Sequence, residues 1–318
     1  MRKSIGGVLA AWACILTATA VAQPFEPPDW AYPLMEPGRG RGADDGTLLS
    51  VPGSTLRRTQ TQIDDPFGPP DWFPHEHPAP PPIVAHGRPP NVRACGQCHM
   101  FHGMGHPESS MLAGQPVNYV VQQMRDFKSG ARESLYRRHN SMLLSATHIT
   151  EAEILVAAQY YARLEPVKWV TVIEAQTVPE TYVGQGNMRH AEPGGGSEPI
   201  GGRIIEIPED SGRAERRDPH SPFIAYVPPG SVAAGRALAS TGGGRTIQCD
   251  ICHGADLKGL ADIPRIAGMS PIYVARQLWD IKYGARSGAS AALMQAVVAN
   301  LTDEDVVSLS AYVASLDP

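Results

Sequence analysis

Four of the five cysteines form two pairs with the same spacing, and a histidine follows each pair directly. The two segments are Cys95-Gly96-Gln97-Cys98-His99 and Cys249-Asp250-Ile251-Cys252-His253. C-x-x-C-H is the attachment sequence of c-type haem, in which two thiols bond to the vinyl groups of one porphyrin. The adjacent histidine then becomes an axial ligand of the iron. The sequence therefore predicts two covalently attached haem c groups, with His99 and His253 as proximal ligands.

Other uses of a cysteine pair account for less of this pattern. A thioredoxin-like C-x-x-C site requires no histidine after it, whereas here both pairs carry one. A zinc site with four cysteines would need the pairs to converge, although Cys95 and Cys249 lie 154 residues apart. A disulfide across two residues would be strained, but it remains an alternative for an exported protein.

The residues after each motif repeat at the same offset of 154. The best-matched positions are Tyr119 with Tyr273, Gln123 with Gln277, and the D-x-K-x-G-A-R segments at 126–132 and 280–286. Apolar residues recur at helical spacing in each copy, at Val120, Met124 and Phe127 and at Val274, Leu278 and Ile281. This pattern predicts an amphipathic helix in each copy that ends near its glycine.

A further helix is predicted at the end of each copy. Thr150 with Glu153 forms a capping-box pattern, and Thr302 with Asp305 is its counterpart. The apolar residues expected to be buried in these helices are Ile154, Leu155, Tyr161, Val306, Leu309, Val313 and Leu316. The repeat as a whole predicts a duplicated helical haem domain.

Methionines at matching places in the two copies are candidates for the second axial ligand. Met142 lies 43 residues after His99, and Met294 lies 41 residues after His253. Because His/Met ligation is typical of cytochromes c, we predict Met142 and Met294 as the distal ligands. Met269, beside an Ala-Gly turn, is interpreted as a packing residue. The histidines near the first motif remain alternatives there: His102, His106, His139 and His148.

These motifs resemble the class I c-type cytochromes, in particular the tandem dihaem cytochromes of bacterial periplasms. The resemblance covers about 83–165 and 231–318. It implies a mainly α fold of two class I cytochrome c domains in tandem, His/Met haems, and one-electron transfer between redox partner proteins. The family's proline after C-x-x-C-H, whose carbonyl supports the proximal histidine, is matched by Pro264. The first copy has Ser110 there, so the sequence leaves the support of His99 open.

Three segments lie outside the two copies. Residues 1–22 have the pattern of a cleaved signal peptide, which predicts a periplasmic protein. Residues 23–82 form a proline-rich arm in which the pattern P-F-x-P-P-D-W occurs twice. We expect this arm either to be a disordered leader or to dock its aromatic residues on the first copy or on a partner. Its His75-Glu76-His77 segment is interpreted as an exposed loop tip.

Residues 166–230 connect the copies, and two short strands are predicted there at 170–173 and 204–207. The second copy begins with a predicted helix at 231–239, whereas the first retains only 83–88 before two prolines. Such a domain would expose apolar surface unless another segment covered it.

Composition excludes several classes of function. The formal net charge of −5 argues against nucleic-acid binding, and no apolar run beyond the N-terminus is long enough for an integral membrane bundle. Membrane association is therefore expected only through partners. The leading hypothesis is a periplasmic electron carrier rather than an enzyme. The alternatives are a cytochrome subunit of a larger dehydrogenase or oxidase, and a dihaem enzyme such as a peroxidase or a sulfur-compound dehydrogenase.

Overall fold

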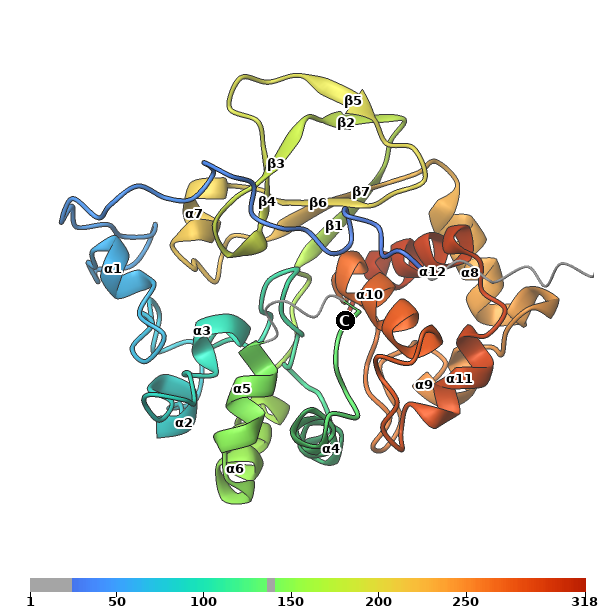
Figure 1. The fold of residues 1–318 in the computed structure, drawn as a ribbon, viewed down its shortest axis with the longest axis horizontal. Coiled ribbons are helices and arrows are strands. Elements are labelled where there is room, and N and C mark those ends of the chain that lie inside the picture. Colours follow the sequence, from blue (N-terminus) through green and yellow to red (C-terminus); the bar gives the residue numbers. More distant parts are fainter. Residues whose placement is uncertain (1–24, 136–140) are drawn as a thin grey trace, which may run out of the picture.

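The computed structural model describes residues 25–135 and 141–318, so the predicted signal peptide at 1–22 lies outside the described residues. Two groups of helices lie side by side, and a layer of short strands lies along one side of both (Figure 1). The first group contains Cys95 and the second contains Cys249, so the groups correspond to the two copies of the repeat. Within the described ranges, no helix combines the length and the apolar character that crossing a bilayer requires.

The first copy contains the helices that the repeat predicts. The two predicted helices are α4 (Val117–Ser129) and α6 (Glu151–Ala162), and the structure adds α3 (Gly96–His99) and α5 (Ser141–His148), which were not predicted. Helix α4 ends at Gly130 with φ 78°, a left-handed conformation that favours glycine, and α6 begins with the predicted capping box at Thr150. The prediction that Leu155 is buried is wrong, because its side chain is 43% exposed.

The second copy repeats this arrangement and adds a leading helix. Its helices are α8 (Ser231–Thr241), α9 (Asp250–His253), α10 (Pro271–Lys282), α11 (Ala292–Val298) and α12 (Asp303–Ser315). The predicted helix at 231–239 is confirmed as α8. The capping box at Thr302 is also confirmed, with the side chain of Asp305 returning to the backbone N–H of Thr302.

The connector between the copies folds into short strands. A three-stranded sheet has the order β1 (Val170–Glu174), β7 (Phe223–Val227) and β6 (Ile205–Pro208), with β1 parallel and β6 antiparallel to β7. Two ribbons pair β2 (Thr177–Pro179) with β5 (Ser197–Pro199) and β3 (Thr181–Val183) with β4 (Arg189–Ala191). The strands predicted at 170–173 and 204–207 are confirmed, and the other five were not predicted.

This sheet packs on both copies. Trp169 and Phe223 belong to the core of the first copy, and Ile204 and Val227 pack with Ile272 of the second. The short helix α7 (Ser211–Glu215) lies between β6 and β7 and buries Ala214 against the first copy. The connector is therefore a folded segment that packs on both copies, which explains why it is longer than a simple linker.

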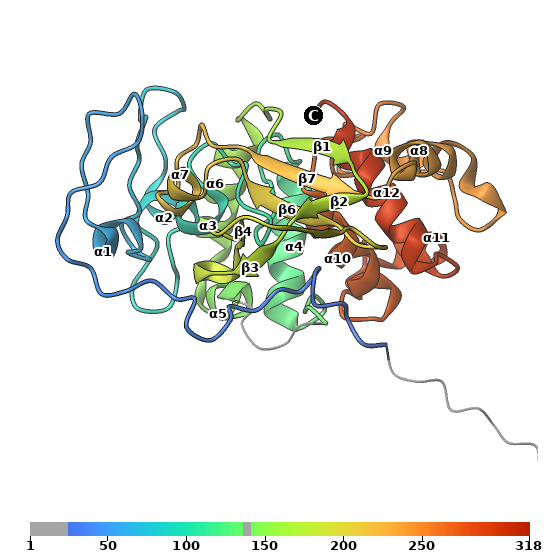
Figure 2. The ribbon, with the colours of Figure 1, turned by 90° about the horizontal axis from the view of Figure 1, so that it is seen from above.

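The N-terminal arm also packs on both copies (Figures 1 and 2). In the second copy, the ring of Phe25 stacks on that of Tyr283 with 3.9 Å between the ring centroids. The ring of Trp30 packs edge-on against Trp279 with 5.5 Å between the centroids. The arm then passes the connector strands and reaches α1 (Gln60–Ile63) beside the first copy, where Trp72 packs in a small apolar cluster. The arm therefore docks its aromatic residues within this chain, but Phe25 and Trp30 pack on the second copy rather than on the predicted first copy. Docking on a partner stays a prediction, and the described residues 25–82 are not a disordered leader.

Helix α2 (Pro82–Ala85) takes the place of a longer leading helix in the first copy. Its Ile83 and Val84 are buried in the core of that copy. The apolar surface that the missing helix would have left exposed is therefore covered by α2, the arm and the connector together.

Glu206 in β6 is buried where the connector meets the second copy. Its Oε2 accepts hydrogen bonds from Ser270 Oγ at 2.7 Å and from Ile272 N–H at 3.4 Å, at the start of α10. Burial raises the pKa of this carboxyl to about 7, because it outweighs the opposing effect of the two hydrogen bonds.

This raised pKa gives a prediction with a definite sign. The protonated carboxyl stabilises the fold below its unfolded-state pKa of 4.5, and this contribution is lost as the pH rises through about 7. At about pH 4 the free energy of unfolding of Glu206→Gln should equal that of the parent. At about pH 8 it should exceed that of the parent by up to about 3 kcal/mol. Urea denaturation of the holoprotein at both pH values measures this. A difference that is the same at both would contradict the prediction.

Candidate haem-binding sites

Each cysteine pair occupies one helical turn, with its first cysteine at the N-cap position. The backbone N–H of His99 donates to the carbonyl of Cys95 at 2.9 Å, and His253 N–H donates to the carbonyl of Cys249 at 2.9 Å. Cysteines three residues apart in such a turn face the same side. All four are free thiols, so the disulfide alternative is wrong for the structure described.

The histidines predicted as proximal ligands have the same hydrogen bond in both copies. Nδ1 of His99 lies 2.8 Å from the carbonyl oxygen of Ser110, and Nδ1 of His253 lies 2.8 Å from that of Pro264. Because a carbonyl only accepts, Nδ1 carries the proton and Nε2 presents its lone pair. Burial lowers the pKa of both imidazoles, which keeps them neutral. Ser110 therefore supplies the support that its departure from the family pattern left open.

These residues fit covalent haem better than the other uses of cysteine. Burial raises the pKa of Cys95 to about 12 and that of Cys249 to about 11, so both are protonated thiols in the absence of a metal ion. In the part of the chain that the structure describes, no three histidine, cysteine or acidic side chains are grouped closely enough to hold a metal ion. Each copy thus offers a thiol pair and one oriented imidazole, the set that haem c requires.

The predicted distal residues lie at equivalent places in the two copies. Met142 is on α5 and Met294 is on α11, in each case the helix directly before the capped final helix, and both side chains are partly buried. Met294 packs against the core of the second copy. Met269 is buried in the shared core, as expected for a packing residue. The ligand roles of Met142 and Met294 stay predictions.

The alternative histidines of the first copy have other surroundings. Burial lowers the pKa of His102 and of His106 to about 3, and their rings lie against Trp169 and Phe223. His148 is exposed, and its Nδ1 lies 3.0 Å from the carbonyl oxygen of Leu144. His139 lies outside the described residues.

The polar residues repeated in both copies form the interface between the copies, which the sequence did not predict. Backbone hydrogen bonds cross it reciprocally: Glu133 N–H donates to the carbonyl of Ala285, and Ser287 N–H donates to that of Ala131, each at 2.7 Å. The two bonds are related by the offset of 154, so the copies meet about a pseudo-twofold axis. The sequence feature that could have indicated this interface is the occurrence of the same polar residues in both copies at this offset.

Two arginines, the buried Arg132 and the partly buried Arg286, cross this interface in the same reciprocal way. Arg132 donates to Tyr273 Oη at 2.9 Å and to Gln277 Oε1 at 3.0 Å, both in the other copy. Arg286 donates to Tyr119 Oη at 3.2 Å and to Gln123 Oε1 at 2.8 Å. The interface therefore fixes the position of each attachment turn relative to the other.

Removing one of these arginines should loosen the contact between the copies. Arg132→Met removes three charge-assisted hydrogen bonds, to Gln123, Tyr273 and Gln277, while Arg286 still donates to the two glutamines, so we expect a loss of about 2 kcal/mol in the free energy of unfolding. Urea denaturation of the holoprotein measures it. The matched control is Arg125→Met, which removes an exposed ion pair between α4 and Glu151 of α6 and should change little. Equal losses in the two variants would contradict the role given to Arg132.

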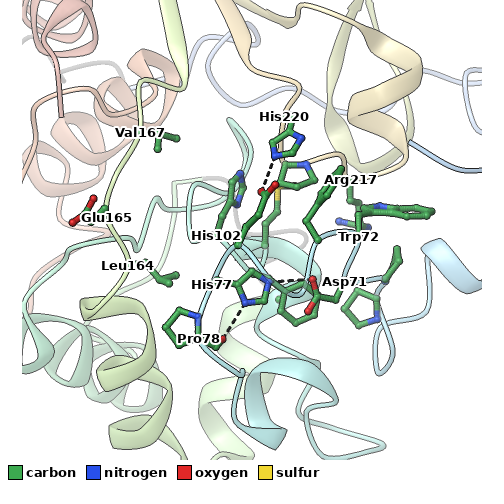
Figure 3. Close-up of a pocket in the computed structure, with 18 of the residues that line it drawn as sticks. Asp71, Trp72, His77, Pro78, His102, Leu164, Glu165, Val167, Arg217 and His220 are labelled. Carbon is green, nitrogen blue, oxygen red and sulfur yellow. Dashed lines mark hydrogen bonds and ion pairs between the residues drawn. The ribbon is translucent and has the colours of Figure 1, made fainter. Parts of the chain in front are cut away.

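A cavity of about 550 Å³ separates the arm from the first copy and the connector (Figure 3). His77 lies at its edge, where Nε2 is 3.0 Å from Asp71 Oδ1 and Nδ1 is 3.2 Å from Tyr160 Oη. The interpretation of this segment as an exposed loop tip is thus wrong for His77, whose side chain is buried, and is correct for His75 and Glu76.

Comparison with known proteins gives sequence relatives, and no family model matches. The chain is 26% identical to a thiosulfate dehydrogenase electron acceptor of Thiomonas intermedia over 233 residues, covering 71% of this chain and 80% of that protein. It is 24% identical to cytochrome c4 of Pseudomonas aeruginosa over 230 residues, covering 70% and 83%. It is 37% identical to cytochrome c-554(548) of Halomonas halodenitrificans over 78 residues, covering 24% and 94%.

Proposed function

This chain belongs to the class I c-type cytochromes, and we propose that it accepts electrons from a periplasmic dehydrogenase. It is a dihaem electron-transfer protein with two covalently bound haem c groups. The similarity to a thiosulfate dehydrogenase electron acceptor, over 71% of the chain, is the observation that supports this choice of partner. The signal-peptide pattern at 1–22 supports export to the periplasm.

The roles of the chain's own residues follow from their surroundings. Each haem, when bound, supplies a reversible one-electron couple between Fe(III) and Fe(II). In our proposal Cys95, Cys98, Cys249 and Cys252 hold the two porphyrins, and His99 and His253 each present Nε2 to one iron. The carbonyls of Ser110 and Pro264 fix the orientation of these imidazoles and raise their basicity.

Met142 and Met294 are proposed to close the second axial position. A thioether ligand favours the reduced iron and leaves no site for a small substrate, which suits a carrier better than a peroxidase or another dihaem enzyme. A permanent cytochrome subunit of a dehydrogenase complex is the second candidate, and the name of the Thiomonas relative fits it as well. Copurification from the native periplasm separates the carrier from the subunit.

The test combines the oxidised holoprotein with a purified thiosulfate dehydrogenase and thiosulfate. We expect reduction of both haems, two electrons per chain, and no reduction by thiosulfate alone. Carbon monoxide should not bind the reduced protein. A failure of the dehydrogenase to reduce the chain would overturn the proposed partner, and carbon monoxide binding would overturn the closed coordination and favour an enzyme.

A further inference from the structure

The two haem-attachment turns differ in their exposure, although their backbones are alike. Gln97 and Ile251 occupy the same place in the repeat, directly before the second cysteine. Gln97 is only 6% exposed, whereas Ile251 is 61% exposed. Cys252, next to Ile251, is exposed, while Cys98 is partly buried. The first attachment turn is therefore covered and the second is open.

Two segments outside the repeat cover the first turn. From the arm, the carbonyl of Asp64 accepts from Gln97 Nε2 at 3.2 Å, and the carbonyl of Pro66 accepts from Ala94 N–H at 2.9 Å. From the connector, the guanidinium of Arg217 donates to the carbonyls of Gln97 and Ile63. We call these two segments, residues 63–78 and 216–220, the cap.

The cap is a built structure rather than a loose covering. Trp72 Nε1 donates to the carbonyl of Arg216 at 2.7 Å. His220 Nε2 lies 2.7 Å from Glu76 Oε2 (Figure 3), so two side-chain contacts join the arm to the connector. Arg217 has a φ of 59°, a conformation that a residue with a side chain rarely adopts. The fold keeps this strain where it places the guanidinium against the first turn.

No described segment covers the second turn in this way. The aromatic residues at the start of the arm pack on α10 instead, at Trp279 and Tyr283. Two further aliphatic side chains are exposed, Ile247 at 43% and Leu293, on α11, at 75%. The exposed Arg245 before Ile247 is paired with Asp305 Oδ1 at 2.7 Å. A hydrogen bond from Thr246 Oγ1 to the carbonyl of Val297, at 2.6 Å, joins the segment before the turn to α11.

We propose that redox partner proteins exchange electrons with this chain through the second copy, on a docking surface formed by Ile247, Ile251 and Leu293. Helix α11 carries no charged residue, and Asp250 is the only one between Ile247 and Ile251. The occupant is therefore a redox protein whose own contact face is apolar, because charge contributes little to this surface. The first copy exchanges electrons only with the second. This inference rests on the electron-transfer function but not on the identity of the dehydrogenase.

The test uses cytochrome c-554(548) of Halomonas halodenitrificans as a protein probe, since its length is close to that of one copy. Electron exchange between it and the holoprotein is followed by stopped flow in both directions, with dithionite as a small reductant for reference. Ile251→Glu should slow exchange with the protein probe about tenfold or more, because a carboxylate would be buried at the contact, and leave dithionite reduction unchanged. Leu155→Glu, at an exposed leucine of the first copy, is the matched control and should leave both rates unchanged.

Hydrogen exchange gives a second readout that does not depend on electron transfer. Adding the oxidised probe should protect amides in 247–254 and 292–298, and not those in 63–78 or 94–99. Protection of the cap, an unchanged rate in Ile251→Glu, or exchange with dithionite but never with the probe would each overturn the proposal. A stable dimer of this chain that Ile251→Glu dissociates would also overturn it, because a second copy would then occupy the surface. None of these results depends on whether thiosulfate dehydrogenase is the partner.

Discussion

Replacing Gly235 by alanine should disrupt the packing of α8 on α12 and strongly lower the free energy of unfolding of the protein. Gly235 lies in the middle of α8, where this helix crosses α12, and a Cβ atom there would lie 2.0 Å from the backbone oxygen of Ser308 and 2.8 Å from Tyr312 Cβ. Both helices would have to separate, because backbone atoms cannot move aside as a flexible side chain can. We expect a loss of at least about 3 kcal/mol in the free energy of unfolding, after the gain of about 1 kcal/mol in helix propensity.

Urea denaturation of the holoprotein, followed by far-ultraviolet circular dichroism, measures this loss. The control is Gly202→Ala in the connector, where nothing lies within 4 Å of the added methyl group and φ is not positive. That variant should stay within about 0.5 kcal/mol of the parent. If Gly235→Ala were equally harmless, α8 and α12 would not cross as closely as the structure shows.

Removing the thioether of Met294 should abolish the closed coordination of one haem. In Met294→Ala we expect about half of the near-infrared methionine–iron absorbance to be lost and a high-spin component to appear in the paramagnetic-resonance spectrum. Carbon monoxide should then bind one haem per chain in the reduced state. Met142→Ala is the counterpart and should remove the other half, because each copy is predicted to use its own methionine.

The control for the two ligand variants is Met35→Ala, at an exposed methionine of the arm, which should leave both spectra unchanged. A full-strength absorbance in Met142→Ala would return the first site to one of its histidine alternatives. Unchanged spectra in Met294→Ala would contradict the inference that methionines at matching places in the repeat are the distal ligands. The second copy offers no histidine alternative, because no histidine follows His253 in the sequence.

The chemistry of this chain could be predicted from short-range patterns. The spacing of Cys95, Cys98 and His99 describes a single helical turn, so the sequence alone indicates both haem c groups and their proximal histidines. The repeated helices and their capping boxes at Thr150 and Thr302 are local as well, because each is determined by residues a few positions apart. The two errors of exposure, Leu155 and His77, arose where a distant segment or its absence decided burial.

What only the tertiary structure decided is the relation between the copies and their surroundings. The sequence showed Gln123 and Arg132 only as repeated positions, and they are buried because the other copy packs on them. The contact between Arg217 and Gln97 joins residues 120 positions apart, and no periodicity in the sequence reports it. Two attachment motifs of the same pattern thus differ in exposure, because burial depends on long-range packing that neither motif encodes.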